Sequence, residues 1–215
     1  MYENLPLTLK NRKQWVAWKA SIRDGKEIKI PIDPNLQKTS PASVSNPKTW
    51  GTYDQAIAAC QRFQCDGIGF VFTNEDLFVG VDLDDCRDPK TGEIEPWAKK
   101  IIKDLNSYTE VSPSGSGVHI FVKAKLSVSG RKGKEIEIYS QGRYFTVTGR
   151  HLKNTPTTIN KRNVEVIKLF HEYFPPKETK PMANKLSEPA PLHQLHQIKG
   201  YIDTDNNIVD DRKVF

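Results

Sequence analysis

The chain of 215 residues has only three cysteines and lacks a long apolar run. No stretch approaches the roughly 18 apolar residues that a membrane-spanning helix needs. The N-terminus also lacks the basic start and apolar stretch of a secretory signal peptide. The number of cysteines is odd, so Cys60, Cys65 and Cys86 give no support to a disulfide scaffold. These absences exclude a membrane protein and favour a cytoplasmic protein with reduced thiols over a secreted one.

Two further signatures are absent from the sequence. Cys86 lies far from Cys60 and Cys65 and has no histidine nearby, so no zinc site is expected. No Walker A loop is present either, so any helicase would lie outside this chain.

The composition is that of an ordinary folded domain, with 37% hydrophobic and 27% charged residues and four Trp, nine Phe and seven Tyr. The residues up to 175 are predicted to form one domain. A shift to prolines spaced among Lys, Glu, Ser and Asn indicates a linker at 176–192. Residues 193–215 are expected to form a C-terminal extension, which would suit the start of a further domain.

Apolar periodicity predicts strands and helices intermixed, which is the α+β class. Alternating or continuous apolar runs predict strands at 15–18, 28–32, 67–72, 78–84, 118–124, 135–139 and 144–148.

Three helices are predicted. Thr52 and Gln55 form a capping box at the start of the first, which extends to about residue 63, and Pro96 begins the second. The third covers about 163–174 and ends at Pro175-Pro176. Its inner stripe is predicted to be Val164, Ile167 and Phe170.

Charge is divided between two neighbouring blocks, within a net charge of +6. Residues 76–110 hold nine acidic and five basic side chains, whereas residues 123–153 hold eight basic and two acidic ones. This order suits carboxylates that hold cations beside basic groups that hold phosphates. Ordinary solvated surface charge gives the same pattern, so both interpretations stay open here.

The strand at 78–84 ends in Asp82 and Asp84. Alternation puts both carboxylates on one face, about 7 Å apart, with Val79, Val81 and Leu83 on the other. A divalent cation would remove their repulsion and would use the oxygen ligands that magnesium and manganese prefer. The alternative is that the two carboxylates lie on a solvent-exposed strand face and bind no cation.

A turn of small residues, 112–117, leads into His119 and an apolar strand. Its backbone N–H groups, together with the hydroxyls of Ser114 and Ser116, suit phosphate oxygens, and a donating imidazole can also meet a phosphate. The alternative is a flexible hairpin with an incidental histidine.

A third segment alternates strictly, burying Ile136 and Ile138 and leaving Glu135 and Glu137 on the opposite face. Arg143 and Tyr144 follow at the next turn, where they suit a phosphate, a base or a sugar. A hairpin with a surface arginine is the alternative.

Together these three segments resemble the three signature motifs of the archaeo-eukaryotic primase superfamily. The first motif corresponds to Asp82 and Asp84, the second to the turn that ends in His119, and the third to Glu137. The chain looks most like the primase-polymerases of phages, plasmids and other mobile elements, over about residues 8–174. The resemblance implies an RNA-recognition-motif-like catalytic sheet packed on an N-terminal α/β layer, with a cleft between them. One departure is Gly117, two residues before His119, where the family often has a serine.

By this resemblance, Asp82, Asp84 and Glu137 would hold two divalent ions, Mg²⁺ or Mn²⁺, and His119 would contact the triphosphate. Weaker candidates for nucleotide binding are Ser114, Ser116, Arg143, Tyr144 and Lys29.

The implied activity is primer extension, and also primer initiation, on single-stranded DNA from dNTPs or NTPs, with a helicase as a further partner. The implied location is the host cytoplasm or nucleoid. A non-catalytic nucleic-acid-binding module is the main alternative, and a glycosyltransferase or a nuclease is the other.

Overall fold

Two antiparallel sheets and four α-helices make up residues 2–175, the part of the chain that the computed structural model describes. The predicted linker, 176–192, and the predicted extension, 193–215, lie outside the described residues. Among the residues described, no helix has the length and apolar character that crossing a membrane requires.

The first sheet has four strands, in the spatial order β2 (Lys26–Ile32), β1 (Trp15–Arg23), β3 (Gly67–Phe72) and β9 (Arg143–Val147). The second has five, in the order β5 (Thr109–Val111), β6 (Val118–Lys123), β4 (Phe78–Leu83), β8 (Ile136–Tyr139) and β7 (Gly130–Lys132). Neighbouring strands are antiparallel throughout both sheets.

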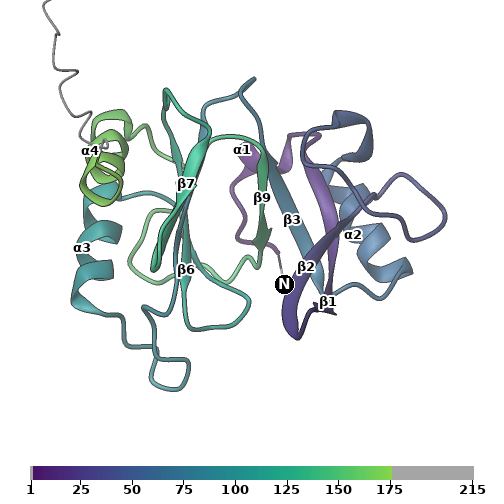
Figure 1. Cartoon of the computed structure of the whole chain (residues 1–215), viewed down its shortest axis with the longest axis horizontal. Helices are drawn as coiled ribbons and strands as arrows, with labels where there is room; N and C mark the ends of the chain where they lie inside the picture. Colours follow the sequence, from purple (N-terminus) through teal and green to yellow (C-terminus); the bar gives the residue numbers. More distant parts are fainter. Residues whose placement is uncertain (1, 176–215) are drawn as a thin grey trace, which may run out of the picture. The chain divides into compact units, whose positions relative to one another are not determined.

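The helices are α1 (Leu7–Lys10), α2 (Tyr53–Arg62), α3 (Pro96–Leu105) and α4 (Asn163–Tyr173), with a 3₁₀ turn at Pro47–Thr49. Across the view of Figure 1 the order is α3 with α4, the five-stranded sheet, the four-stranded sheet, and α2. The side chains of α3 and α4 pack on the face of β4 that carries Val79, Val81 and Leu83. The opposite face of this sheet is therefore left for the first sheet and for the site.

Aromatic rings join the two sheets. Phe72 of β3 and Phe145 of β9 lie 5.0 Å apart between ring centroids, and Phe121 of β6 stacks on Phe72 at 5.9 Å. Along this face β4 passes from buried Phe78 through Gly80 to Asp82. One strand thus belongs to the apolar core at its start and carries carboxylates at its end.

The mixture of helices and antiparallel sheets agrees with the predicted α+β class. All seven predicted strands and three predicted helices are present, and the capping box of Thr52 and Gln55 is confirmed. The RNA-recognition-motif-like catalytic sheet stays a prediction.

The predicted inner stripe of α4 is wrong at Val164, whereas Phe170 is buried and Ile167 packs against the core as predicted. Val164 is 75% exposed, whereas Val166, Leu169 and Phe170 are buried. The helix therefore faces the sheet through positions i, i+3 and i+4 counted from Val166.

Replacing Gly80 by alanine is expected to destabilise the fold. A Cβ atom at this position would lie 2.5 Å from ring atoms of both Phe72 and Phe145. Overpacking of this kind typically costs about 1–3 kcal/mol of the free energy of unfolding. Thermal unfolding of the Gly80→Ala variant measures the loss, and an unchanged midpoint would show that the two sheets separate easily at this contact.

Candidate active site

Asp82 lies at the centre of the site because β4 is flanked on both sides by strands that carry polar residues in register. It is the cross-strand partner of His119 on β6 and of Glu137 on β8. Directly opposed residues on a sheet face have Cβ atoms about 4.5–5.5 Å apart. Three residues that lie far apart in the sequence are therefore neighbours in one row across three strands.

Among the described residues, the carboxylate of Asp82 has one basic partner, His119, whose Nε2 atom lies 3.6 Å from Asp82 Oδ1. Asp82 Oδ1 is buried and has no hydrogen-bond partner among the described residues. Burial, and next the negative charge of Asp82, raise the pKa of Asp84. A buried acceptor without a partner is costly, and an ion is one of the ligands that removes the cost.

Glu137 is engaged by a lysine. Its Oε1 atom forms an ion pair with Lys132 of β7, a strand that the sequence did not predict. Within residues 2–175, no three His, Cys, Asp or Glu side chains come close enough to hold a metal ion. The oxygen donors, Asp82 Oδ1 among them, suit a hard divalent cation, and Glu137 would join them by exchanging Lys132 for the cation.

His119 is 3% exposed and lies between two acids. Its Nε2 atom is 3.6 Å from Asp82 Oδ1, and its Nδ1 atom is 3.4 Å from Glu110 Oε1. Burial lowers the pKa of His119, but Asp82 and Glu110 outweigh burial, and the net result is a raised pKa. The protonated imidazole is favoured, and it can donate from Nε2 to an anionic ligand.

The small-residue turn is attached to the segment that follows Asp84. The hydroxyls of Ser112, Ser114 and Ser116 form a chain with 3.0 Å steps, and Ser116 Oγ donates to Asp85 Oδ1 at 3.4 Å. Arg87 donates from its backbone N–H to Ser116 O and from Nη1 to Gly115 O, both at 2.8 Å.

Gly117 is required at this turn by close contact. A Cβ atom there would lie 2.5 Å from Leu83 O and 3.5 Å from the Cα atom of Asp84. The departure from the serine that is frequent in the family therefore has a steric reason in this chain.

The other predicted nucleotide-binding residues, Tyr144, Lys29 and Arg143, contact groups other than the three carboxylates. Tyr144 donates from its hydroxyl to the Lys29 carbonyl oxygen at 2.6 Å. The Lys29 ammonium lies over the Trp18 ring, 5.7 Å from its centroid. Arg143 lies over the Tyr139 ring at 5.2 Å. In the described part of the chain, none of these three side chains forms a hydrogen bond or ion pair with Asp82, Asp84 or Glu137.

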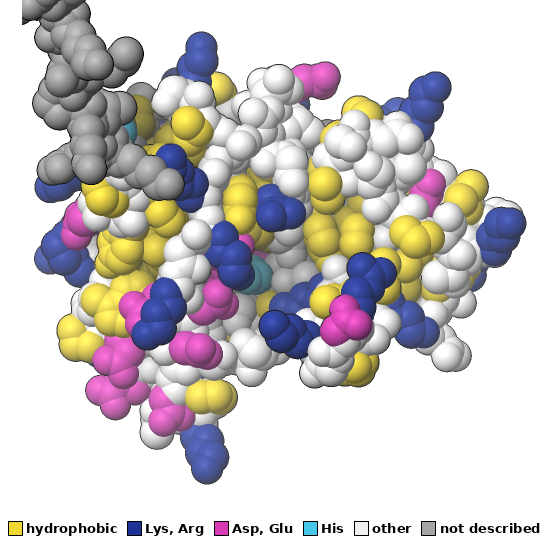
Figure 2. All heavy atoms as spheres, in the orientation of Figure 1, with side chains coloured by type: hydrophobic (Ala, Val, Ile, Leu, Met, Phe, Trp, Pro, Cys, Tyr) yellow, Lys and Arg dark blue, Asp and Glu magenta, His cyan; other side chains and the backbone are white. Residues whose placement is uncertain are grey.

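A hollow opens near the centre of the face shown in Figure 2. Acidic side chains and a histidine are visible at its left side, and Lys and Arg side chains lie around it. Acidic and basic side chains are thus gathered at one opening of this face.

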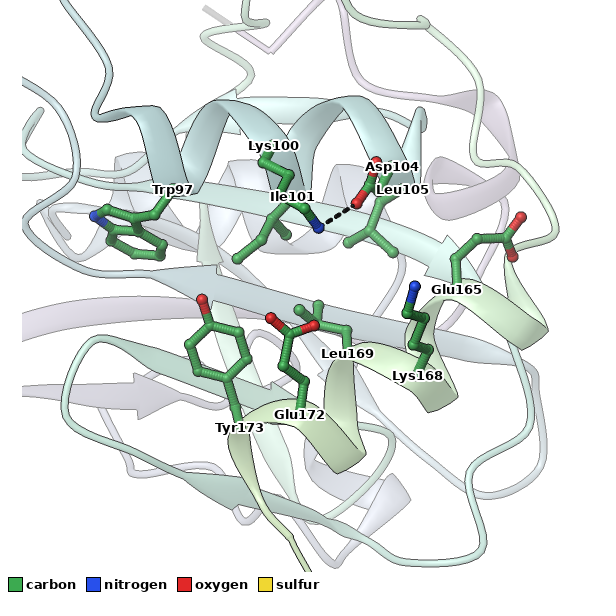
Figure 3. A pocket seen from close by; sticks show the side chains of 10 residues that line it. All are labelled: Trp97, Lys100, Ile101, Asp104, Leu105, Glu165, Lys168, Leu169, Glu172 and Tyr173. Atoms are coloured by element: carbon green, nitrogen blue, oxygen red, sulfur yellow. Dashed lines mark hydrogen bonds and ion pairs between the residues drawn. The ribbon is translucent and has the colours of Figure 1, made fainter.

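A separate pocket of about 340 Å³ lies between α3 and α4. Figure 3 shows Trp97, Ile101 and Leu105 from α3 facing Leu169 and Tyr173 from α4. Because these helices cover the Val79 face of β4, the pocket lies on the side of the sheet opposite to Asp82. It is therefore not part of the carboxylate site.

Sequence reasoning missed Glu110, Lys132 and Arg87. Glu110 is a fully buried acid in the short strand β5. An acidic residue is rarely buried without a partner, so the signal was an acid within a strand, and it required the strand to be recognised first. Lys132 and Arg87 gave no signal, because their partners Glu137 and Gly115 are recognised only from the fold.

No family model matches the chain. The protein described as DNA Primase-polymerase from Nitratiruptor phage NrS-1 is 40% identical over 142 residues, which cover 63% of this chain and 19% of that protein. The match thus spans about a fifth of the length of this curated relative. The similarity supports a primase-polymerase family.

Proposed function

We propose that residues 2–175 form the catalytic domain of a DNA primase-polymerase, which transfers nucleotides to a primer on a DNA template. The observation that carries the proposal is the row of Asp82, His119 and Glu137 on three adjacent strands, with a buried Asp82 oxygen that accepts no hydrogen bond from the described residues. The 40% identity to a protein of that name supports the same activity.

Asp82, Asp84 and Glu137 would hold the divalent ions, Mg²⁺ or Mn²⁺. When bound, such ions stabilise charge on the attacking and leaving oxygens of an in-line displacement. In this displacement the primer 3′ hydroxyl attacks the α-phosphate of the nucleotide and pyrophosphate leaves.

His119 would donate from Nε2 to a phosphate oxygen, because Nδ1 faces the acceptor Glu110. The backbone N–H groups of the turn, with the Ser114 and Ser116 hydroxyls, would hold the remaining oxygens. Lys29 and Arg143 would add positive charge, and Tyr144 would pack against the sugar of the incoming nucleotide.

The substrates would be a single-stranded DNA template with its primer and dNTPs or NTPs. A helicase would be a further functional partner, and the setting would be a host cell that carries a mobile element. The test is to incubate the full chain with primed and unprimed single-stranded DNA, labelled nucleotides of each sugar type, and Mg²⁺ or Mn²⁺. No incorporation under any of these conditions would refute the proposal.

A non-catalytic nucleic-acid-binding module is the second candidate. The ion pair between Glu137 and Lys132 favours it, since the charge of the third carboxylate is already compensated within the protein. Under this alternative the chain binds single-stranded DNA equally well with and without divalent ions and incorporates no nucleotide.

The variant His119→Ala is expected to bind nucleotide more weakly. Loss of one charge-assisted hydrogen bond typically costs about 1.5–3 kcal/mol, which corresponds to roughly tenfold or more in affinity. Primer extension measured over a range of nucleotide concentrations gives the half-saturation point. An unchanged half-saturation point with a normal rate would make His119 a purely structural residue.

A further inference from the structure

Glu110 is the most enclosed acid of the site. Its side chain has no exposed surface, and both of its oxygens accept hydrogen bonds from several directions. Oε1 accepts from Thr148 N at 3.0 Å, and Oε2 accepts from Gly149 N at 2.9 Å and from the Tyr108 hydroxyl at 3.0 Å. These three donors match the two oxygens of a carboxylate, which can only accept hydrogen bonds.

The remaining contact of Glu110 is with His119. The two residues are cross-strand partners on β5 and β6, and Glu110 Oε1 lies 3.4 Å from His119 Nδ1. Because the carboxylate only accepts, Nδ1 must carry the proton in this contact. The Phe145 ring lies 5.3 Å from the imidazole and limits its rotation further. The opposite ring nitrogen, Nε2, is consequently turned toward Asp82.

Glu110 also joins two parts of the fold that form the site. Thr148 and Gly149 directly follow β9 of the four-stranded sheet, whereas Glu110 and His119 belong to the five-stranded sheet. One carboxylate thus fixes the end of β9 and the orientation of the histidine together.

We propose that Glu110 is a positioning residue for nucleotide binding: it holds the His119 ring with Nδ1–H directed at its own carboxylate, so that Nε2 faces the Asp82 side of the site, where the phosphates of the substrate would lie. The part that concerns phosphates rests on the proposed function above. The control of the ring by Glu110 rests only on the contacts just described.

The test compares Glu110→Gln with Tyr108→Phe. The glutamine keeps the shape but presents NH₂ where one oxygen accepted, so it cannot satisfy all four donors. Tyr108→Phe removes one donor to the same carboxylate without touching His119, and it serves as the matched structural control. Both variants of the full chain are compared with the parent protein by thermal unfolding, by ¹⁵N NMR of the His119 ring, and by nucleoside triphosphate binding without turnover.

Both variants are expected to lower the unfolding midpoint, but only Glu110→Gln is expected to shift the His119 Nδ1 signal. It should also weaken triphosphate binding by about tenfold, whereas Tyr108→Phe stays within about twofold. Should Glu110→Gln fail to fold, Glu110→Asp keeps the charge while withdrawing it from the ring, and the same two changes are expected of it.

An unchanged Nδ1 signal in Glu110→Gln, or equal weakening of nucleotide binding in both variants, would overturn the positioning role. If the parent protein neither binds triphosphate nor incorporates nucleotide, the proposed function fails. The NMR comparison would still decide whether Glu110 controls the ring.

Discussion

Replacing Asp82 or Asp84 by alanine is expected to reduce nucleotide incorporation by about 10²-fold or more while the fold is retained. Metal-stabilised charge supplies several kcal/mol to such reactions, and each 1.4 kcal/mol is a factor of ten in rate. The fold should survive because, among the described residues, Asp82 Oδ1 accepts no hydrogen bond. The Asp82 variant loses the 3.6 Å contact with His119, but the imidazole keeps Glu110 as a partner on its other nitrogen. The pKa of Asp84 is raised by burial and by Asp82, so removing either carboxylate relieves repulsion.

Primer extension measures the loss of nucleotide incorporation, and thermal unfolding with and without Mn²⁺ measures whether the fold is retained. The ion should raise the unfolding midpoint of the parent protein but not that of Asp82→Ala. Asp104→Ala is the matched control, since Asp104 is exposed on α3, on the far side of the sheet. Near-normal extension by either Asp82→Ala or Asp84→Ala would refute their role as metal ligands.

Glu137→Gln is expected to lower incorporation by about tenfold or more, because the amide keeps one oxygen donor but loses the charge that a cation requires. Glu135→Gln should retain most of the activity. The Glu135 side chain is 55% exposed, lies just outside β8 and forms an ion pair with Lys134 at 3.7 Å. The two substitutions are chemically identical and two residues apart, so each controls for the other.

The two variants are compared by their initial rates of nucleotide incorporation at saturating nucleotide and Mn²⁺. A large loss in Glu135→Gln with little change in Glu137→Gln would show that the third motif had been placed two residues too far along the chain.

How far the sequence predicts the fold depends on how much of each element is apolar. β3 was predicted with its observed bounds, because all six of its residues are buried. β7, Gly130–Lys132, has no apolar residue and exists only through its pairing with β8, so no periodicity could reveal it. Val164 was predicted to lie on the inner stripe of α4 because it is apolar. Tertiary packing instead buries the face of the helix that carries Val166, Leu169 and Phe170.

The candidate site divides in a similar way. Strand alternation placed Asp82 and Asp84 on one face, and the motif order brought in His119 and Glu137. The register that aligns Asp82 with both His119 and Glu137 is a property of strand pairing and had to come from the structure. Glu110 was missed because Thr148 and Gly149, which explain its burial, lie 38 and 39 residues away in the sequence.

The attachment of the Ser112–Gly117 turn to the end of β4 determines how the site responds to its substrate. Gly117 abuts Leu83 O, and Arg87 binds the carbonyl oxygens of Gly115 and Ser116. The groups that suit phosphates and the groups that suit cations therefore share one rigid backbone unit, with their separation set when the chain folds. Under the proposed function, a nucleotide would meet a preorganised receptor rather than assemble one, and shortening its phosphate chain should weaken binding without any compensating movement of the turn.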